Sequence, residues 1–407
     1  MSALERAMYS VGGIRLPQPF KIRRLGHFGL DVDSMEECLH FYCDLLGFRV
    51  SDVNDFASRP QNAELLRDVP SKGYFTHYGT DHHALVLFPK LARQMMAESR
   101  GEKMMSDINQ ITWQVGSLKE IVEGISYFHD HEIPVVRSGR DMPGSNWHAY
   151  VPDPEGHTNE LYYGIEQIGW TGHSKPREMY DRKFEEPPVL PQIPESEELS
   201  EAIVRGTNIL AGNVSRDALD PIFDVEGIKL PRPFKITKIG PVNLFVDDIE
   251  ASLRFYTDRM GFVITESTEC LGYECTFLRA GVEHHSLGLF PKPLREALDL
   301  NPETGLASFG IEVGSYEQLR NAVSFLRDSG VELLDLPSSL HPDIDYVAYA
   351  ADPEGHLVAL YYYMEQVGWQ GTPRKRESDT LPMAEWPQVL DALSDTYADQ
   401  TFPGPIG

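Results

Sequence analysis

The sequence has few of the features that mark secreted or membrane-spanning proteins. It contains only four cysteines in 407 residues, with no CxxC pair among them, so all four are expected to be ordinary reduced thiols. No uninterrupted apolar run reaches about 18 residues, which argues against a membrane span. The first residues, MSALERAMYSVGG, lack an apolar core behind a basic end and so do not resemble a signal peptide. We therefore expect a cytoplasmic protein.

Basic residues are also scarce. The 36 Lys and Arg stand against 62 Asp and Glu, which gives a formal net charge of −26. A surface of this sign repels polyphosphate and anionic lipid, so neither nucleic acid nor a membrane is expected as a partner. GxSxG, P-loop and GxGxxG fingerprints are missing from any suitable strand-helix context, which disfavours serine hydrolysis, phosphoryl transfer and dinucleotide binding.

What the sequence does contain is a long internal repeat. VGGIRLPQPFKI begins at Val11 and VEGIKLPRPFKI at Val225. Later, DPEGHTNELYYGIEQIGW from Asp153 matches DPEGHLVALYYYMEQVGW from Asp352. With 41% hydrophobic residues the chain has enough apolar material for two cores, so the repeat predicts two homologous domains. The Pro- and Glu-rich stretch between them, EEPPVLPQIPESEELSEA, cannot sustain a strand ladder.

The first half begins with one strand-helix-strand unit. A strand is predicted over 24–32, and Ser34 follows as a helix N-cap. Apolar residues then recur at helical spacing as far as Gly47, which is a typical C-cap. A strand resumes at once, and two more are predicted over 74–78 and 83–88.

The same order of elements then recurs within that half. A strand is predicted over 110–115, and a capping box of Ser117 and Glu120 opens a helix that runs to about His131. Three further strands are predicted near Pro134, around residue 148 and around residue 159. Since the second half repeats the first, the sequence predicts an α+β fold with four β-α-β-β-β units.

Three motifs carry a resemblance to a known family. The segment FYCDLLGF after the first strand, the strand HHALVLF and the closing strand DPEGHTNELYY resemble the vicinal-oxygen-chelate superfamily. That superfamily includes glyoxalase I, epimerases and extradiol ring-cleaving dioxygenases. The resemblance covers nearly the whole chain outside the linker and tails, and it implies two open cup-shaped mixed sheets with a metal at the base of a cup. Because one scaffold hosts several chemistries, the motifs alone leave the reaction open.

The repeat and the resemblance together divide the chain into five segments. They are an amino-terminal arm (1–22), a metal-binding vicinal-oxygen-chelate domain (23–174), a Pro/Glu-rich linker with a short helix (175–235), a degenerate metal-free domain of the same kind (236–372) and a carboxy-terminal tail (373–407). The second domain is expected to act as scaffold, pocket lid or dimer contact. Relatives often pair, so a homodimer is one expected state.

The resemblance implies metal ligands on the first strand of each unit and on the closing strand of the second unit. In the first half these positions hold His27, Gln110 and Glu160. An imidazole, an amide oxygen and a carboxylate can bind one divalent ion and leave positions open. The matched positions of the second half hold Pro241, Ser308 and Ala359. We therefore expect one divalent ion per chain, Fe(II) first, with Zn(II), Mn(II), Ni(II) and Co(II) as alternatives.

Gln110 departs from the pattern of the ring-cleaving relatives, which have a histidine there. An amide oxygen is a weaker and harder donor than imidazole, and this puts O₂ activation by iron in question. The alignment of this strand with the family pattern also has no glycine to fix its register. Gln110 is therefore the weakest of the three ligand assignments.

Three further residues are candidates for proton chemistry. His83 occupies the strand where ring-cleaving relatives have an acid/base histidine and glyoxalase-like relatives have a fourth ligand, and imidazole suits either role. Tyr150 aligns with a tyrosine that the ring-cleaving relatives direct at the substrate oxygen. The second half has Tyr349 at the same position, so core packing is a competing explanation for this residue. His148 shares the strand face of Tyr150 and has Val347 as its counterpart, which makes it specific to the first half.

These residues fit more than one function. The leading hypothesis is an extradiol-type dioxygenase in which a catechol-like substrate chelates Fe(II) and O₂ takes the remaining position. Against it stand Gln110 and the location of the site, since familiar two-domain relatives keep the metal in the second half. The alternative is a metal-dependent epimerase or isomerase of a cyclic polyhydroxy ketone, or a glyoxalase-like proton-transfer enzyme, which needs only Lewis acidity. A protein that merely binds a small molecule is the third hypothesis. All three hypotheses require the protein to bind a small molecule. In the two enzyme hypotheses this molecule is a substrate with vicinal oxygens.

Overall fold

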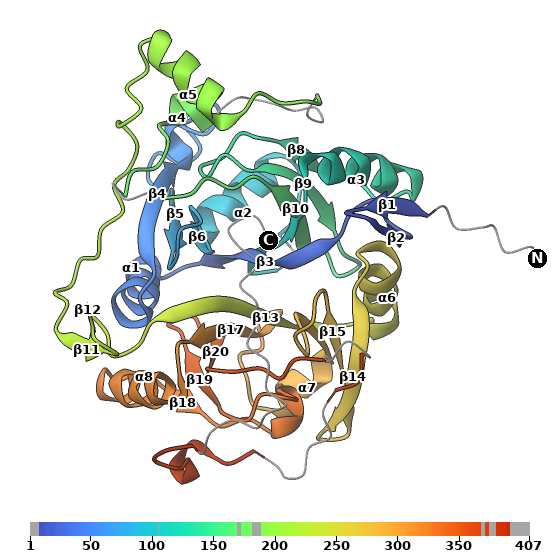
Figure 1. The fold of residues 1–407 in the computed structure, drawn as a ribbon, viewed down its shortest axis with the longest axis vertical. Helices are drawn as coiled ribbons and strands as arrows, with labels where there is room; N and C mark the ends of the chain where they lie inside the picture. The colour runs from blue at the N-terminus through green and yellow to red at the C-terminus, as the bar shows by residue number, and fades with distance from the viewer. Residues whose placement is uncertain are drawn as a thin grey trace, which may run out of the picture.

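Each half of the chain forms one curled, eight-stranded mixed sheet. In Figure 1 the sheet of the first half lies above the sheet of the second half. This computed structural model describes residues 8–104, 106–168, 172–180, 189–367, 371–373 and 380–390. The α+β class and the two cups predicted from the sequence are confirmed.

The first sheet has the strand order β4-β5-β6-β3-β7-β10-β9-β8. Its strands are β3 (Ile22–Val32), β4 (Arg49–Asp55), β5 (Lys72–His77), β6 (Leu85–Pro89), β7 (Ile108–Val115), β8 (Arg137–Gly139), β9 (Trp147–Pro152) and β10 (Thr158–Tyr163). Within each unit the first and last strands are parallel neighbours, β3 with β6 and β7 with β10. The antiparallel pair β3 and β7 joins the two units at the centre of the cup.

The second sheet repeats this order as β14-β15-β16-β13-β17-β20-β19-β18. Its strands are β13 (Ile236–Val246), β14 (Val263–Cys270), β15 (Tyr273–Arg279), β16 (Leu287–Pro291), β17 (Leu306–Val313), β18 (Leu333–Leu334), β19 (Val347–Ala351) and β20 (Leu357–Tyr361). The sequence repeat is therefore a repeat of structure, and positions in one cup have counterparts in the other.

The helices are short apart from one in the second unit of each half. The first half has α1 (Met35–Leu39), the π-helix η1 (His40–Leu46), the 3₁₀-helix η2 (Phe56–Ser58), α2 (Lys90–Ser99) and α3 (Leu118–Asp130). The second half has α6 (Ile249–Arg254), the π-helix η3 (Phe255–Arg259), α7 (Lys292–Ala297), α8 (Tyr316–Asp328), η4 (Ser338–Leu340) and η5 (Met383–Glu385). In the described part of the chain, every helix is too short or too polar to cross a bilayer.

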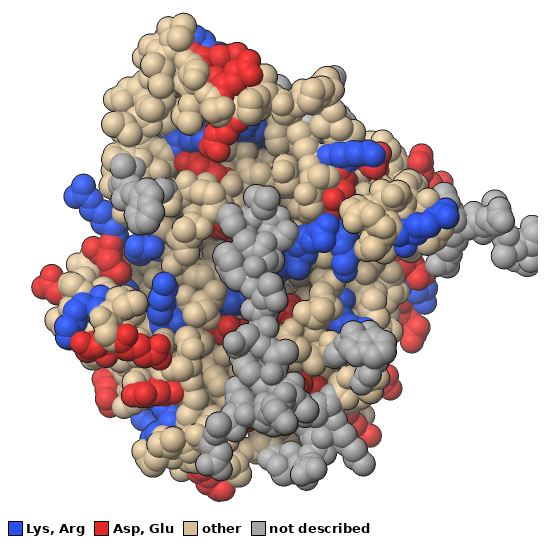
Figure 2. Space-filling model, in the orientation of Figure 1, with Lys and Arg blue, Asp and Glu red and all other residues tan. Residues whose placement is uncertain are grey.

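The segments outside the two sheets carry small elements of their own. The arm holds the hairpin of β1 (Tyr9–Val11) and β2 (Ile14–Leu16), and the linker holds α4 (Arg177–Tyr180), α5 (Glu195–Val204) and the hairpin of β11 (Phe223–Val225) and β12 (Ile228–Leu230). The described part of the linker thus has two helices where one was predicted. Acidic side chains gather over α5 at the top of Figure 2, as its acidic first turn requires. Of the predicted tail, only residues 373 and 380–390 lie within the described residues.

The sequence signals for helix ends act as predicted at two places. The side chain of Ser117 accepts a hydrogen bond from the backbone N–H of Glu120 at the start of α3. Gly47 ends η1 with a φ of 103°, in the left-handed region that favours glycine. Between α1 and Gly47 the turns widen into a π-helix, which places the adjacent aromatic residues Phe41 and Tyr42 both on the buried side. Both residues recur in the second half, as Phe255 and Tyr256, and that recurrence predicts a place in the core or the cup wall.

One predicted strand boundary is wrong, and one helix was not predicted. The strand predicted over 83–88 begins at Leu85, so His83 lies in the turn before β6. That turn is held from outside the sheet, because the backbone N–H of His82 donates to the carbonyl of Glu166. The helix α2 was not predicted at all.

One hydrophobic core lies between the two cups and contains residues of both. The rings of Phe28 on β3 and Phe309 on β17 stack with centroids 4.9 Å apart. Trp113 on β7 meets Phe262 edge-on, also at 4.9 Å. Because side chains of one half fill the core of the other, neither cup can be expected to fold in isolation.

Buried polar contacts cross the same interface in a reciprocal way. Tyr42 donates its hydroxyl to Asp352 at 2.9 Å, and its counterpart Tyr256 donates to Asp153 at 2.9 Å. Both aspartates belong to the DPEGH segments that recur in the two halves. The repeat therefore supplies matched partners across the interface.

A buried histidine adds an ion pair to this interface. His356 Nε2 lies 2.8 Å from Asp107 Oδ2, and His356 Nδ1 lies 3.0 Å from Asp352 Oδ2. Burial lowers the pKa of His356, but the hydrogen bonds with Asp107 and Asp352 outweigh it and raise that pKa to about 10. Burial raises the pKa of Asp107, but the hydrogen bond with His356 brings it down to about 2.

We predict that His356→Gln lowers the free energy of unfolding by about 3–5 kcal/mol at pH 6, because it leaves the buried Asp107 carboxylate unpaired. The folded-state pKa of His356 lies above its ordinary value of 6.5, so its contribution is complete below about pH 6.5 and is lost as the pH rises toward 10. Urea unfolding from pH 6 to pH 10 measures this, and the difference between wild type and variant should shrink. His157→Gln is the control, since His157 bonds Asp153 within its own half. A constant difference across this range would contradict the assignment.

Candidate metal centre in the first cup

The base of the first cup brings together polar side chains from three adjacent strands. The register pairs His27 on β3 with Thr112 on β7, and Thr112 with Glu160 on β10. His27 Nε2 lies 3.0 Å from Glu160 Oε2, and the hydroxyl of Thr112 donates to the same oxygen at 2.9 Å. All three side chains are fully buried. An imidazole, a hydroxyl and a carboxylate thus converge on one point.

Two of the three predicted ligands, His27 and Glu160, are in contact. The third, Gln110, is not among the side chains that contact Glu160. Gln110 lies on β7 two residues before Thr112, and therefore on the same face of the strand. Its partner across the register is Gly29, so it lies two residue pairs along the ladder from His27. Sequence alignment could not choose between Gln110 and Thr112, because only strand pairing fixes the register. That Gln110 binds a metal stays a prediction.

At the positions that match His27, Thr112 and Glu160, the second cup has Pro241, Gly310 and Ala359, none of which has a donor side chain. The register there places Gly310 beside Ala359, as Thr112 lies beside Glu160 in the first cup. A Cβ on Gly310 would come within 2.3 Å of the carbonyl oxygen of Gly240, so no larger side chain fits. The surroundings of Ala359 are hydrocarbon and aromatic rings from Ile344, Val347, Tyr349, Leu357, Tyr361 and Met364.

Glu160 is held in its charged form. Burial raises the pKa of Glu160, but the charge of His27 and the hydrogen bond with it outweigh burial, so the pKa lies below its ordinary value. Asn146, in the loop before β9, donates its side-chain amide to the other carboxylate oxygen at 2.8 Å. Both oxygens are therefore oriented, and the buried negative charge has its partners in place.

His83 brings a second imidazole to the site from the turn before β6. Its ring centroid lies 4.1 Å from that of His27. Burial lowers the pKa of His83 well below its ordinary value, and the charges of His27 and His82 lower it further. His83 Nδ1 lies 3.0 Å from Nδ1 of His82, whose ring is directed away toward Asp52. His83 is thus a neutral base whose Nδ1 is already engaged.

Tyr150 and His148 on β9 stand on the other side of Glu160. The register pairs Tyr150 directly with Glu160, and the rings of Tyr150 and His148 are 4.9 Å apart. Burial and the charge of Glu160 raise the pKa of Tyr150 well above its ordinary value. Burial and the charge of Arg137 lower the pKa of His148 to about 4. Both side chains are therefore uncharged at neutral pH.

An apolar wall adjoins these polar groups inside the first cup. The ring of Phe75 meets that of His83 edge-on, with centroids 5.1 Å apart. The wall is formed by buried residues of β5, β6, α2 and the segment between β4 and β5, namely Phe56, Leu66, Phe75, Val86, Phe88, Ala92 and Met96. The first cup thus has polar side chains at its bottom and an apolar wall rich in phenylalanine beside them.

The donor set fits a divalent ion. Glu160 supplies a charged carboxylate, His27 an imidazole nitrogen and Thr112 a hydroxyl, with 3.0 Å between His27 Nε2 and the carboxylate oxygen. In the described part of the chain, the buried Nδ1 of His27 has no hydrogen-bond partner, whereas its Nε2 contacts Glu160. A set with one imidazole and two oxygens suits a borderline or hard divalent cation.

Comparison with known proteins connects this arrangement to a family and to named relatives. Residues 24–161 and 238–360 match the family model described as Glyoxalase/Bleomycin resistance protein/Dioxygenase superfamily. Metapyrocatechase 2 of Cupriavidus necator is 32% identical over 149 residues, which cover 36% of this chain and only 38% of that protein. Catechol-2,3-dioxygenase of Bacillus subtilis is 24% identical over 265 residues, which cover 65% of this chain and 73% of that protein.

Solved structures show the same fold at low sequence identity. A crystal structure of BphC, a halotolerant catechol dioxygenase, superimposes with a TM-score of 0.54 at 15% identity, covering 89% of this chain and 93% of that chain. The Mn(II)-bound glyoxalase from Novosphingobium aromaticivorans gives a TM-score of 0.51 at 14% identity, covering 86% and 85%. The duplicated two-cup scaffold is therefore shared with proteins of different chemistry.

We predict that Thr112→Val weakens the binding of a divalent metal roughly tenfold or more, because it removes the hydroxyl that orients Glu160. Gln110→Leu, on the same strand face, should change the affinity less. Competition of the purified, metal-stripped protein against a fluorescent chelator measures both dissociation constants. A larger loss for Gln110→Leu than for Thr112→Val would restore Gln110 as the third ligand.

Proposed function

Because the chain belongs to the Glyoxalase/Bleomycin resistance protein/Dioxygenase superfamily, we propose that its first cup is the active site of an extradiol-type ring-cleaving dioxygenase. The substrate would be a catechol-like aromatic, and the co-substrate O₂. The named relatives Metapyrocatechase 2 and catechol-2,3-dioxygenase support this. The observation that carries the proposal is the neutral ring of His83, 4.1 Å from that of His27 at the charged Glu160 carboxylate.

His27, Glu160 and Thr112 would hold the metal. A divalent ion, Fe(II) for ring cleavage, would supply Lewis acidity and a place where vicinal substrate oxygens and O₂ meet. Hydrogen bonds from Thr112 and Asn146 orient the Glu160 carboxylate. The site is in this sense organised before substrate arrives.

His83 is the proposed proton acceptor. In the tautomer in which His83 Nδ1–H donates to Nδ1 of His82, Nε2 of His83 is left to take the proton of a substrate hydroxyl. Because burial holds the ring neutral, this nitrogen is free to accept at neutral pH. The proton that arrives can be returned to a product oxygen by the same atom.

Tyr150 is the proposed hydrogen-bond donor to a substrate oxygen. Its raised pKa keeps the hydroxyl protonated, and the guanidinium of Arg137 lies 5.4 Å from the centre of its ring. The cation over the ring face polarises the tyrosine and adds positive charge beside the developing oxyanion. The apolar wall around Phe75 favours an aromatic substrate over a polyhydroxylated one.

One observation favours a second candidate function. The donor set at the base of the cup has one imidazole, with Thr112 at the place next to His27 and Glu160. Such a set suits Lewis-acid chemistry that needs no O₂, as in a metal-dependent epimerase or isomerase or a glyoxalase-like enzyme. The similarity in fold to a Mn(II)-bound glyoxalase is in keeping with it.

Oxygen uptake separates the two candidates. The metal-loaded protein is incubated with a panel of catechols in an oxygen electrode while the absorbance of a ring-opened product is followed. Ring cleavage requires O₂ uptake equal to the substrate consumed. Turnover of a cyclic hydroxy ketone without O₂, with deuterium from D₂O entering the product, would favour the epimerase and refute the dioxygenase.

We predict that Tyr150→Phe lowers kcat on the active catechol roughly 10- to 100-fold with little change in KM, because the lost hydrogen bond is formed chiefly as charge develops on the substrate oxygen. Tyr349→Phe is the matched control, since Tyr349 holds the equivalent position in the second cup. Steady-state kinetics of both variants provide the measurement. Equal losses in the two variants would assign Tyr150 to packing.

A further inference from the structure

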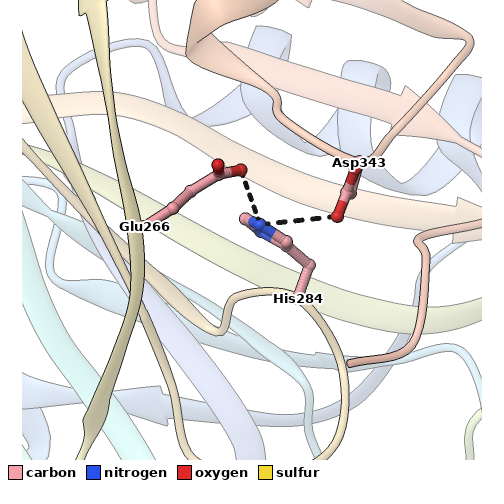
Figure 3. A group of neighbouring side chains, drawn as sticks. All are labelled: Glu266, His284 and Asp343. Carbon is pink, nitrogen blue, oxygen red and sulfur yellow. Dashed lines mark hydrogen bonds and ion pairs between the residues drawn. The ribbon is translucent and has the colours of Figure 1, made fainter. Parts of the chain in front are cut away.

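A second cluster of potential metal ligands lies in the other half of the chain. It consists of Glu266 on β14, His284 in the turn before β16 and Asp343 in the loop before β19. Figure 3 shows the two carboxylates approaching the imidazole from different sides, one from the edge strand and one from the loop. We propose that these three residues form a separate site for a divalent transition-metal ion such as Zn(II). The proposal does not depend on the function of the first cup.

The distances suit shared coordination. His284 Nε2 lies 2.8 Å from Glu266 Oε1 and 3.6 Å from Asp343 Oδ2, and a ligand atom of each residue lies within 4.8 Å of the others. Two atoms that each bind one ion at about 2.0–2.2 Å are separated by about 3–3.5 Å at tetrahedral or octahedral angles. Small side-chain rotations therefore bring all three atoms onto a common centre.

The protonation of His284 also fits a ligand. Its Nδ1 lies 3.0 Å from Nδ1 of His285, so one of these two nitrogens must carry a proton. When His284 carries it, its Nε2 turns a lone pair toward both carboxylates, and a metal cation bound between them would relieve the repulsion, as a proton on Nε2 would. An imidazole that donates through one nitrogen and coordinates through the other is the usual arrangement of a metal-bound histidine.

Burial leaves the cluster open on one side. His284 is completely buried, whereas the Glu266 side chain keeps 34% of its surface exposed. An ion can therefore enter from solvent, and water can complete its coordination. One imidazole and two carboxylates form the mixed nitrogen and oxygen set that Zn(II), Mn(II) and Co(II) accept, and that Mg(II) and Ca(II) rarely use.

The corresponding place in the first half cannot form this site. His82 is the counterpart of His284, and Gly144 is the counterpart of Asp343, since the carbonyls of Gly144 and Asp343 accept from Glu166 and Glu365 respectively. A Cβ on Gly144 would come within 2.8 Å of the ring of His83, so no carboxylate fits there. The third ligand thus exists only in the half that lacks the first-cup ligands.

Metal stoichiometry of the full chain tests the proposal. In a Glu160→Gln background, where the first cup is disabled, the chelator-stripped protein should bind one Zn(II) in a calorimetric titration, and Co(II) should give a protein-dependent visible spectrum. Adding Asp343→Gly should abolish this binding. The backbone at 343 has a φ of 60°, which glycine adopts freely, so the variant should fold.

Two further variants test whether the metal binds at this cluster. Glu266→Gln should weaken the affinity at least tenfold, while Glu269→Gln, the same charge change at an exposed position of β14, should leave it unchanged. Circular dichroism verifies the fold of each variant. If the Glu160→Gln protein binds no ion, or binds it as tightly with Asp343→Gly as without, the site does not exist. Loss of binding in Glu269→Gln as well would mark it as general attraction to acidic surface and overturn the proposal.

Discussion

A charged carboxylate buried at the base of the first cup is the constraint around which this molecule is arranged. Burying an unpaired carboxylate costs several kcal/mol. Glu160 has His27, Thr112 and Asn146 as partners, and its pKa stays below the ordinary value. The other cup has the same strand order around Ala359 and a hydrocarbon filling, which means that the fold itself does not need this charge. A costly group that the scaffold can omit is best explained by function.

The two halves have divided their roles while remaining one folding unit. Aromatic pairs such as Phe28 with Phe309, and the reciprocal bonds of Tyr42 and Tyr256, hold the cups together through a common core. The first cup has polar side chains in its interior beside an aromatic wall. The second cup fills the same interior with apolar side chains, and its titratable cluster lies elsewhere, at Glu266 and Asp343. The two halves therefore share one strand order, whereas the side chains inside the two cups differ.

Much of this could be predicted from the sequence because the repeat allowed each position to be compared with its counterpart. The two cups followed from the family resemblance, whereas the helix caps at Ser117 and Gly47 and the contrast between Glu160 and Ala359 followed from local pattern or from that comparison. That Thr112 lies opposite His27 could not be predicted, since it depends on the register between β3 and β7. The ion pair of His356 and the cluster around His284 join residues distant in sequence, and no local signal marks such contacts.

The location of bound metal tests the central claim most directly. Crystals of the protein grown with Mn(II) or Fe(II) would be measured near the absorption edge of the metal, and an anomalous difference map would be calculated. The account predicts a peak within bonding distance of His27 Nε2 and Glu160 Oε2. A loaded crystal that shows no peak there, with Glu160 still paired to His27, would contradict it.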